Sequence, residues 1–378
     1  MRTIDMLRQL VAFDTTSAGT NLPLIAFVED LLAKHGIESR RIPNPQGTKA
    51  NLLAVIGPIS EPGVVLSAHT DVVPVDGQNW STDPFTATEH KKRLYGRGTA
   101  DMKSFIAAIL SALPAFVAAD LRVPIHIALS YDEEVGGLGA PDLIRALESL
   151  PVLPRFCVVG EPTEMQVVTD HKGIGTYRVN VTGVERHSSL APQGVNAVEY
   201  AARLIVFLQD LARDIAKNGP FDPGYVVPHS TVHVGTVAGG TALNIVPGSC
   251  VFQFEIRNLP TDDLDTILRR IREEGDRLAR EMGSYGAIHI EPNVYLPGLS
   301  TARDAQIVRW ANSLAERRDT GKVTYGSEAG LFSNAGIPSI LLGPGNIAQA
   351  HQPDEYVSVA QLALADRFVS NLIGWAKR

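Results

Sequence analysis

The chain has 378 residues and carries 34 Lys and Arg against 41 Asp and Glu, a formal net charge of −7. Its 44% hydrophobic residues are enough for a sizeable core, and its two cysteines exclude a disulfide scaffold and a Cys-based zinc finger. We expect a cytoplasmic protein that binds neither nucleic acid nor a membrane, because there is no Lys/Arg block, no signal-peptide core and no apolar run of roughly 18 residues.

Helical and strand-like segments alternate over the first part of the chain. In order, the apolar pattern predicts helices over 4–11 and 24–32, strands over 51–56 and 64–67, a helix over 102–119, a strand over 123–130, a helix over 142–150 and a strand over 156–159. Short apolar runs bounded by turn residues are typical of strands buried on both faces. The alternation therefore predicts an α/β domain with a largely parallel central sheet.

The rhythm changes after residue 173. A strand over 177–181, a helix over 196–216, strands over 231–237 and 251–256, a helix over 262–281 and a strand over 287–290 form the ferredoxin-like α+β pattern. The α/β rhythm then resumes with a helix over 305–315, a strand over 339–342 and a helix from 360. We therefore expect a main domain formed by 1–173 and 292–378, split by an inserted domain at 174–291.

Histidine and acidic side chains follow four of the predicted strands at their carboxyl ends. They are His69 and Asp71, Glu133 and Glu134, Glu161, and His351, while Asp101 directly precedes the helix over 102–119. Ligands of open α/β sheets bind at this edge, so we expect these side chains to share one crevice. Taken singly, each could be a solvated side chain or a helix cap. Taken together, so many charges are too costly to bury unpaired, and dications would resolve that cost.

This set of side chains suits two metal ions. Histidine and carboxylate ligands without cysteine favour zinc, with cobalt or manganese as substitutes. One bridging carboxylate, with a His and a terminal carboxylate on each ion, uses five ligands: His69, Asp101, Glu134, Glu161 and His351. Glu133 then stays unligated and can accept a proton from water, and Asp71 can orient the imidazole of His69. The pattern predicts a two-metal hydrolase centre.

Other motifs in the chain are weaker. The run Gly96-Arg97-Gly98-Thr99-Ala100 stops short of a dinucleotide-binding motif, because Asp101 stands at its last glycine position. There is no Walker A loop and no G-x-S-x-G elbow. His126, inside a predicted strand, is expected to be a core residue whose polar atoms are satisfied.

Five motifs, in order along the chain, resemble the dinuclear zinc amidohydrolases and peptidases of the M20 type. They are Ser67-Ala68-His69-Thr70-Asp71, Gly98-Thr99-Ala100-Asp101-Met102-Lys103, Asp132-Glu133-Glu134, Gly160-Glu161-Pro162-Thr163 and His351. The resemblance covers essentially the whole chain. It implies a zinc-peptidase-like catalytic domain with the same metal ligands and the same base.

Further segments resemble the acetylornithine deacetylase branch of that family. They are Trp80-Ser81-Thr82-Asp83-Pro84-Phe85, His171-Lys172-Gly173, and Gln349-Ala350-His351-Gln352-Pro353-Asp354-Glu355-Tyr356. This implies hydrolysis of N-acetyl-L-ornithine to L-ornithine and acetate, a step of arginine biosynthesis. A succinyl-diaminopimelate desuccinylase and a broader aminoacylase or dipeptidase remain alternatives. From another class, a non-catalytic, metal-stabilised binding protein remains as well.

The resemblance also implies a role for the inserted domain as a lid that pairs two subunits in a homodimer. In the family it lends a histidine to the partner's site, which matches His187, although Arg186 stands where a small residue is more usual. Arg257 matches an arginine that grips the carboxylate of an N-acyl amino acid substrate, and Asn244 matches an amide donor. Our own candidate for the partner of the substrate's side-chain ammonium is Glu328, with an exposed loop acid as the alternative interpretation.

Overall fold

The computed structural model describes residues 1–378, which form two compact units. The first unit comprises Met1–Asp170, Leu299–Lys322 and Ser327–Arg378, and the second comprises His171–Gly298 and Val323–Gly326. The second unit thus begins and ends outside the 174–291 expected from the sequence, and a short segment near residue 325 joins it.

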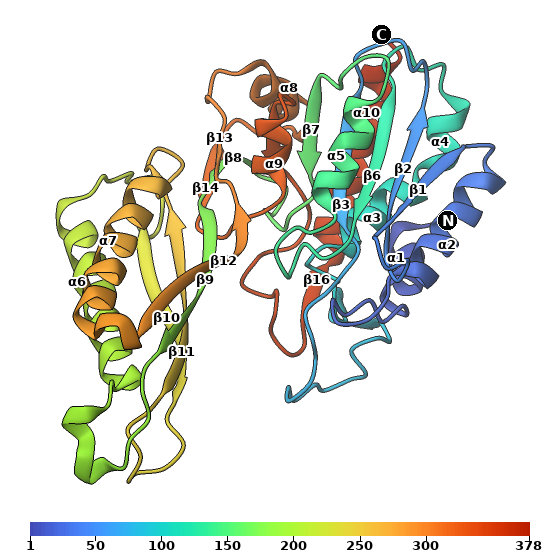
Figure 1. Ribbon diagram of the computed structural model, residues 1–378. Helices are drawn as coiled ribbons and strands as arrows, with labels where there is room; N and C mark the ends of the chain where they lie inside the picture. The colour runs from blue at the N-terminus through green and yellow to red at the C-terminus, as the bar shows by residue number, and fades with distance from the viewer. The chain divides into compact units, whose positions relative to one another are not determined.

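The first unit is built on a mixed nine-stranded sheet (Figure 1). β3, β6, β7 and β15 run parallel, whereas β1, β2 and β8 are antiparallel to their neighbours. This confirms the predicted α/β class with a mostly parallel central sheet. In spatial order the strands are β1 (Ser39–Pro43), β2 (Ala50–Ile56), β6 (Ile125–Ser130), β3 (Val64–His69), β7 (Phe156–Val159), β15 (Ser339–Leu341), β8 (Val167–His171) and β13 (Leu299–Ser300), with β14 (Thr320–Val323) paired to β8.

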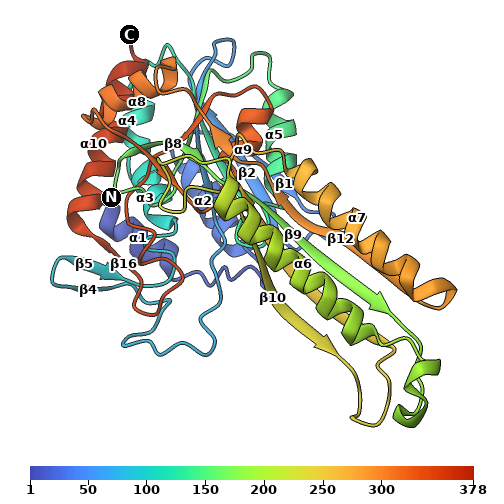
Figure 2. The same cartoon turned by 90° about the vertical axis from the view of Figure 1, so that its left-hand side faces the viewer.

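Helices cover both faces of this sheet. α1, α3, α8 and α10 pack together on one face, with α2 in the same apolar core, while α5 and α9 contact the strands from the other face (Figures 1 and 2). The central strands β3, β6 and β7 are buried along their whole length, which explains why most of their residues are apolar. The helices are α1 (Thr3–Val11), α2 (Leu22–Lys34), α3 (Lys103–Ser111), α4 (Leu113–Ala118), α5 (Ala140–Glu148), α8 (Gln306–Ala315), α9 (Ala329–Asn334) and α10 (Val359–Ala376).

The single helix expected over 102–119 is wrong, because the structure divides it into α3 and α4 at Ala112. Pro114 lies in the first turn of α4, where its missing N–H is tolerated. In an unbroken helix the same proline would remove a hydrogen bond and its ring would clash with the preceding turn. A small antiparallel sheet was also not predicted; it consists of β16 (Tyr356–Ser358), β5 (Arg93–Tyr95) and β4 (Thr88–His90).

The second unit is a four-stranded antiparallel sheet with two long helices on one face (Figure 1). Its strand order, β10-β11-β9-β12, confirms the ferredoxin-like pattern. The apolar stripe of α6 includes Leu204, Leu208 and Leu211, and the side chain of Asn196 caps the helix by accepting from two backbone N–H groups. The elements are β9 (Gly173–Thr182), α6 (Ala197–Asn218), β10 (Thr231–Gly239), β11 (Ser249–Asn258), α7 (Leu264–Met282) and β12 (Ala287–Leu296), with 3₁₀ turns at Ser188–Gln193 and Gly283–Tyr285.

No helix in either unit combines the length and the apolar character that spanning a bilayer requires.

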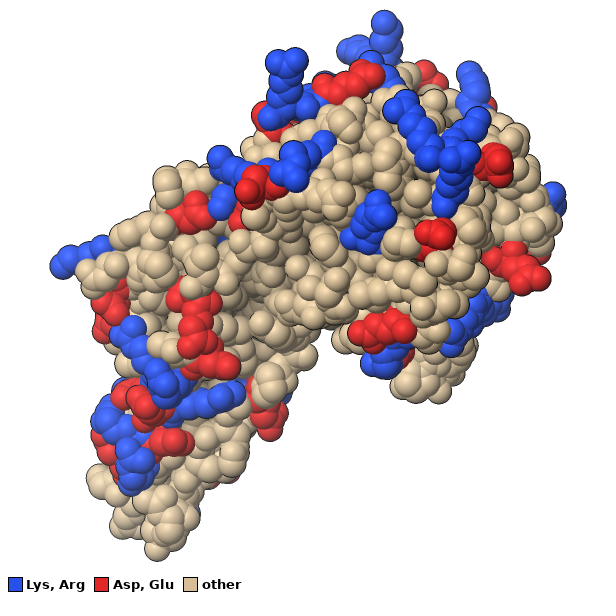
Figure 3. Space-filling view, turned by 90° about the horizontal axis from the view of Figure 1, so that it is seen from above, with Lys and Arg blue, Asp and Glu red and all other residues tan.

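On the face drawn in Figure 3, acidic and basic side chains are interspersed.

His126 is a buried, unpartnered histidine in the middle of the central sheet. It lies in β6, is 1% exposed, and neither ring nitrogen has a hydrogen-bond partner. Burial lowers the pKa of His126 to about 4, since the charged imidazolium is poorly tolerated there. The expectation that it is a core residue is met, but its polar atoms are not satisfied.

This burial predicts an acid-dependent loss of stability that a substitution should remove. Because the folded-state pKa is depressed, the unfolded state takes up the proton first as the pH falls from about 6.5 towards about 4. We expect His126→Leu to be about 1 kcal/mol more stable than the native protein at pH 7, and to gain up to about 3 kcal/mol more at acidic pH. Urea unfolding at several pH values measures this difference. The exposed His90→Gln is the control, and an unchanged pH dependence in His126→Leu would contradict the assignment.

Candidate metal centre

The residues predicted to bind metal come from segments that end at one edge of the central sheet. The parallel register pairs His69, the last residue of β3, with Ser130, the last residue of β6. The loop after β6 carries Glu133 and Glu134, and Glu161 lies two residues after the end of β7. Sheet pairing therefore fixes the direction from which these side chains enter the site. Asp101 and His351 instead lie on irregular segments, one before α3 and one between β15 and β16.

The structure brings five of these side chains together in two groups. The ligand atoms of His69, Asp101 and Glu161 lie within 4.8 Å of one another, and so do those of Asp101, Glu134 and His351. We call these groups the first and the second cation position. Asp101 belongs to both.

Asp101 presents one carboxylate oxygen to each position. Its Oδ1 lies 2.9 Å from Nε2 of His69, and its Oδ2 lies 3.5 Å from Nε2 of His351. At the second position, Nε2 of His351 is also 3.0 Å from a carboxylate oxygen of Glu134. A carboxylate that reaches a different histidine with each oxygen has the geometry of a bridging ligand. The sequence predicted a bridging carboxylate without saying which residue it is, and the position of Asp101 between the two histidines makes it our candidate for that role.

The electrostatics of this cluster fit two dications. Burial, reinforced by the negative charge of Asp101, raises the pKa of Glu161 well above its usual range. Asp101 is also buried, but hydrogen bonds to His351 and His69 outweigh that burial and lower its pKa. The hydrogen bond to Asp101 likewise raises the pKa of His351 to about 10. A set of buried carboxylates that repel one another, with histidine nitrogens between them, is the donor chemistry of zinc, cobalt or manganese.

Glu133 is in neither cation position. Burial, reinforced by the negative charge of Glu161, raises its pKa well above the usual range, so the carboxylate has a high affinity for a proton at this site. Its backbone N–H donates to Oδ1 of Asp71 at 3.1 Å. A proton acceptor beside two ligand groups, itself unligated, has the arrangement needed for general base catalysis.

Asp71 contacts His69 through its backbone carbonyl and the turn at Glu133 and Glu134 through its carboxylate. The imidazole Nδ1 of His69 is 2.9 Å from the backbone carbonyl of Asp71, whereas the nearest carboxylate oxygen is 3.6 Å away. The carboxylate instead accepts from the backbone N–H groups of Glu133 and Glu134 and from the hydroxyl of Ser17. The carbonyl therefore orients the imidazole, and the carboxylate holds the turn that carries the base and a ligand.

Glu328 is buried and not an exposed loop acid. It is 1% exposed, and its Oε2 accepts from the hydroxyl of Ser130 at 2.9 Å, while Oε1 has no hydrogen-bond partner. Burial raises the pKa of Glu328 to about 7. Since Ser130 pairs with His69 in the sheet, Glu328 lies next to the strand ends that form the centre.

Three predicted substrate-side residues belong to the second unit. There, Nδ1 of the exposed His187 accepts from the backbone N–H of Ser189, which leaves Nε2 as the protonated nitrogen of the neutral ring. The backbone N–H of Ser188 donates to the carbonyl of Asn244 at 2.9 Å, so these two segments lie side by side. Arg257, on β11, forms a two-pronged ion pair with Glu255, at 2.8 and 3.2 Å.

A buried ion pair that was not predicted from the sequence lies next to the candidate metal ligands. Arg97 and Glu355 are almost fully buried and lie 2.7 Å apart. Both residues stand inside quoted motifs, Arg97 in the glycine-rich run and Glu355 four residues after His351. Their presence inside these motifs, as charged residues without an assigned role, could have indicated that they have a function at the site.

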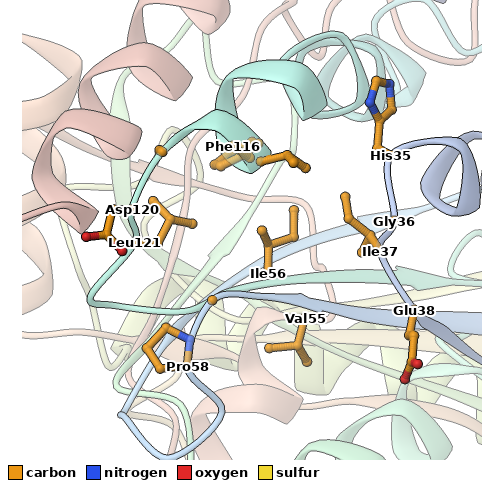
Figure 4. Close-up of a pocket in the computed structure, with 13 residues that line it drawn as sticks. His35, Gly36, Ile37, Glu38, Val55, Ile56, Pro58, Phe116, Asp120 and Leu121 are labelled. Atoms are coloured by element: carbon orange, nitrogen blue, oxygen red, sulfur yellow. The ribbon is translucent and has the colours of Figure 1, made fainter.

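A groove of about 590 Å³ on the first unit lies away from this centre (Figure 4). It is found where β2 ends at Ile56, which pairs with Ile125 at the start of β6, and so at the opposite edge of the parallel strands from His69. Its lining combines apolar side chains such as Phe116 with the acids Glu38 and Asp120. No group of metal-ligating side chains of the kind found around Asp101 occurs in this groove.

Comparison with known proteins reveals similarity over nearly the whole chain. The sequence model of Peptidase family M20/M25/M40 matches residues 65–374. The acetylornithine deacetylase of Proteus mirabilis is 36% identical over 98% of this chain and 95% of its own length, and that of Aliivibrio salmonicida is 35% identical over 86% and 84%. Among solved structures, an M20 family metallo-carboxypeptidase from Sulfolobus solfataricus superposes with a TM-score of 0.78 at 17% identity, covering 100% of this chain and 99% of that one.

Proposed function

Because this chain belongs to peptidase family M20/M25/M40, we propose that it is a two-metal amidohydrolase that converts N-acetyl-L-ornithine to L-ornithine and acetate. The proposal of two-metal chemistry is supported above all by the position of Asp101. Each of its two carboxylate oxygens lies near the histidine of a different cation position. The acetyl-ornithine specificity is supported by the names of relatives that are 33–36% identical over most of the chain.

The centre would hold two zinc ions, or cobalt or manganese in their place. Bound there by His69, Asp101, Glu161, Glu134 and His351, they would supply the Lewis acidity that activates water and polarises an amide carbonyl. The protein's own residues do the rest. The carboxylate of Glu133 accepts the proton of the attacking water and delivers it to the departing amine, and the carboxylate of Asp71 holds Glu133 in place through its backbone N–H.

The second unit would supply substrate contacts. The Nε2–H of His187 is a free donor suited to the oxygen of the scissile carbonyl, where a preorganised donor is typically worth about 3–4 kcal/mol. The neighbouring amide of Asn244 is exposed and free to face a substrate. We further propose that His187 acts on the site of a second copy in a homodimer. Leu190 and Leu243, beside these two residues, are exposed apolar side chains of the kind that subunit contacts bury.

Arg257 is proposed to hold the substrate's α-carboxylate, which predicts a specific kinetic change. Lys would keep the positive charge, but it lacks the planar guanidinium with which Arg binds a carboxylate through two parallel hydrogen bonds. Arg257 makes such a two-pronged contact with the carboxylate of Glu255 in this structure. We expect Arg257→Lys to raise KM about tenfold or more with a smaller effect on kcat. The matched control is Arg178→Lys, an exposed arginine on β9, which should behave like the native enzyme. Equal KM values for Arg257→Lys and the native protein would remove the carboxylate role.

The side-chain ammonium of ornithine needs an acidic partner, for which we propose Glu328. Its free Oε1 is buried close to the strand ends, and a cationic group would stabilise its ionised form.

A substrate panel tests the proposed specificity. Amine release is measured side by side on N-acetyl-L-ornithine, N-succinyl-diaminopimelate, several other N-acetyl amino acids and a dipeptide. We expect kcat/KM for N-acetyl-L-ornithine to exceed the others by at least tenfold. Preference for the succinyl substrate would identify a desuccinylase, and similar values across the panel an aminoacylase or dipeptidase. No hydrolysis of any substrate would favour a metal-stabilised binding protein.

A further inference from the structure

Behind the metal ligands lies a buried network that ties two loops to each other. Glu355 is fully buried and directly precedes β16. Because β16 pairs with β5, this pairing holds the backbone of Glu355 in place. Its carboxylate points at the loop between Gly98 and Asp101. The network also includes Trp80, because the guanidinium of Arg97 lies over its ring and its indole N–H donates to Oε1 of Gln78 at 3.0 Å. The ligands next to the network, Asp101 and His351, lie on irregular segments.

Both oxygens of Glu355 are fully used. Oε1 accepts from the backbone N–H groups of Ala100 at 2.8 Å and Asp101 at 3.1 Å. Oε2 accepts from the backbone N–H of Gly98 at 3.1 Å and from the guanidinium of Arg97 at 2.7 Å. One carboxylate thus accepts from three backbone N–H groups of the loop that carries Asp101.

Arg97 extends the network to the loop that carries His351. Its other terminal nitrogen donates to Oε1 of Gln78 at 2.7 Å, and the amide nitrogen of Gln78 donates to the backbone carbonyl of His351 at 3.0 Å. The imidazole of His351 is half-exposed, and its backbone has a φ of 62°, in the left-handed region that is costly for a residue with a side chain. His351 therefore depends on such contacts to keep its place.

The two cation positions differ in how their ligands are held. The first position takes His69 from the end of β3 and Glu161 from just after β7, so the central sheet holds two of its three ligands. The second position takes Asp101 and His351, which the network holds, together with Glu134, which Asp71 holds. Loss of the network removes support from two ligands of the second position and from only one of the first.

We propose that Arg97, Glu355 and Gln78 form a positioning clamp that sets the metal affinity of the second cation position largely independently of the first. The clamp touches neither cation nor substrate and acts through Asp101 and His351. It rests on the dinuclear centre proposed above. Outer contacts of this kind typically change metal affinity by about 10–100-fold.

The test is calorimetric titration of metal-free protein with Co²⁺ alone, together with the visible absorption of bound Co²⁺, which reports ligand geometry without any turnover. We expect the native protein to bind two equivalents. Glu355→Gln should bind the first within about threefold of native affinity and the second about 10–100-fold more weakly, with an altered spectrum only for the second. The control is Asp354→Asn, the same acid-to-amide change one residue away, whose side chain holds Ser81 and not the 98–101 loop. It should match the native protein.

A second variant covers the case in which Glu355→Gln leaves Arg97 unpaired and fails to fold, which thermal unfolding of the metal-free protein would reveal. Gln78 is partly exposed, so Gln78→Ala should fold, and we expect it to weaken the second equivalent by about two- to tenfold. Native affinity for both equivalents in the folded variants, or an equal loss at both, would overturn the clamp alone. A native protein that binds a single equivalent would overturn the dinuclear centre and the clamp with it.

Discussion

Replacing Glu133 by Gln is expected to lower kcat by about 10²–10⁴-fold while both equivalents of bound metal remain. The carboxylate of Glu133 belongs to neither cation position, so its loss should not remove a ligand. Gln has nearly the same shape but cannot accept a proton from water or return it to the leaving amine. Steady-state amine release gives kcat, and elemental analysis of dialysed protein gives the metal content.

The adjacent residue provides the matched control. Glu134→Gln is the same chemical change one position along the chain, but Glu134 contacts His351 at the second cation position. We expect this variant to lose affinity for the second equivalent of metal. Near-native kcat in Glu133→Gln, or loss of metal from it, would show that Glu133 is not the base.

Asp101→Asn is expected to weaken metal binding at both positions, each by at least about 100-fold. Asp101 is the one ligand common to both groups, and an amide offers a single neutral oxygen where the carboxylate offers two charged ones. Activity should fall below detection at metal concentrations that saturate the native enzyme. Calorimetric titration with zinc or cobalt measures both affinities.

Ligands that belong to one position should have one-sided effects. Glu161→Gln should weaken the first equivalent and His351→Asn the second, each leaving the other close to the native value. If Asp101→Asn affected only one equivalent, the shared role of this carboxylate would be refuted.

Much of the fold and the site follows from local sequence patterns. The strand β7 occupies the predicted range, 156–159, because a short apolar run between turn residues has few alternatives to a buried strand. The position of Glu161 and Glu133 just after strands was enough to expect them at one sheet edge, since parallel strands align their carboxyl ends. Pro114 could have been used to place the break between α3 and α4.

Other features depend on contacts between distant segments. Nothing near Glu328 in the sequence indicates that it is buried against Ser130, 198 residues away along the chain. The contact of Glu355 with Arg97 likewise spans 258 residues, and no periodicity encodes it. Both are charged side chains buried at a functional edge, which the chain's pattern of apolar and polar residues assigns to the surface.

The proposal of a two-metal deacetylase is tested most directly by the rate of amine release from N-acetyl-L-ornithine as zinc or cobalt is added back to chelated protein. We predict no detectable release from the chelated protein, and a rate that rises with added zinc or cobalt and levels off at two equivalents per chain. Full activity in the chelated protein, or no release at any metal content, would contradict the proposal that this centre is a two-metal deacetylase.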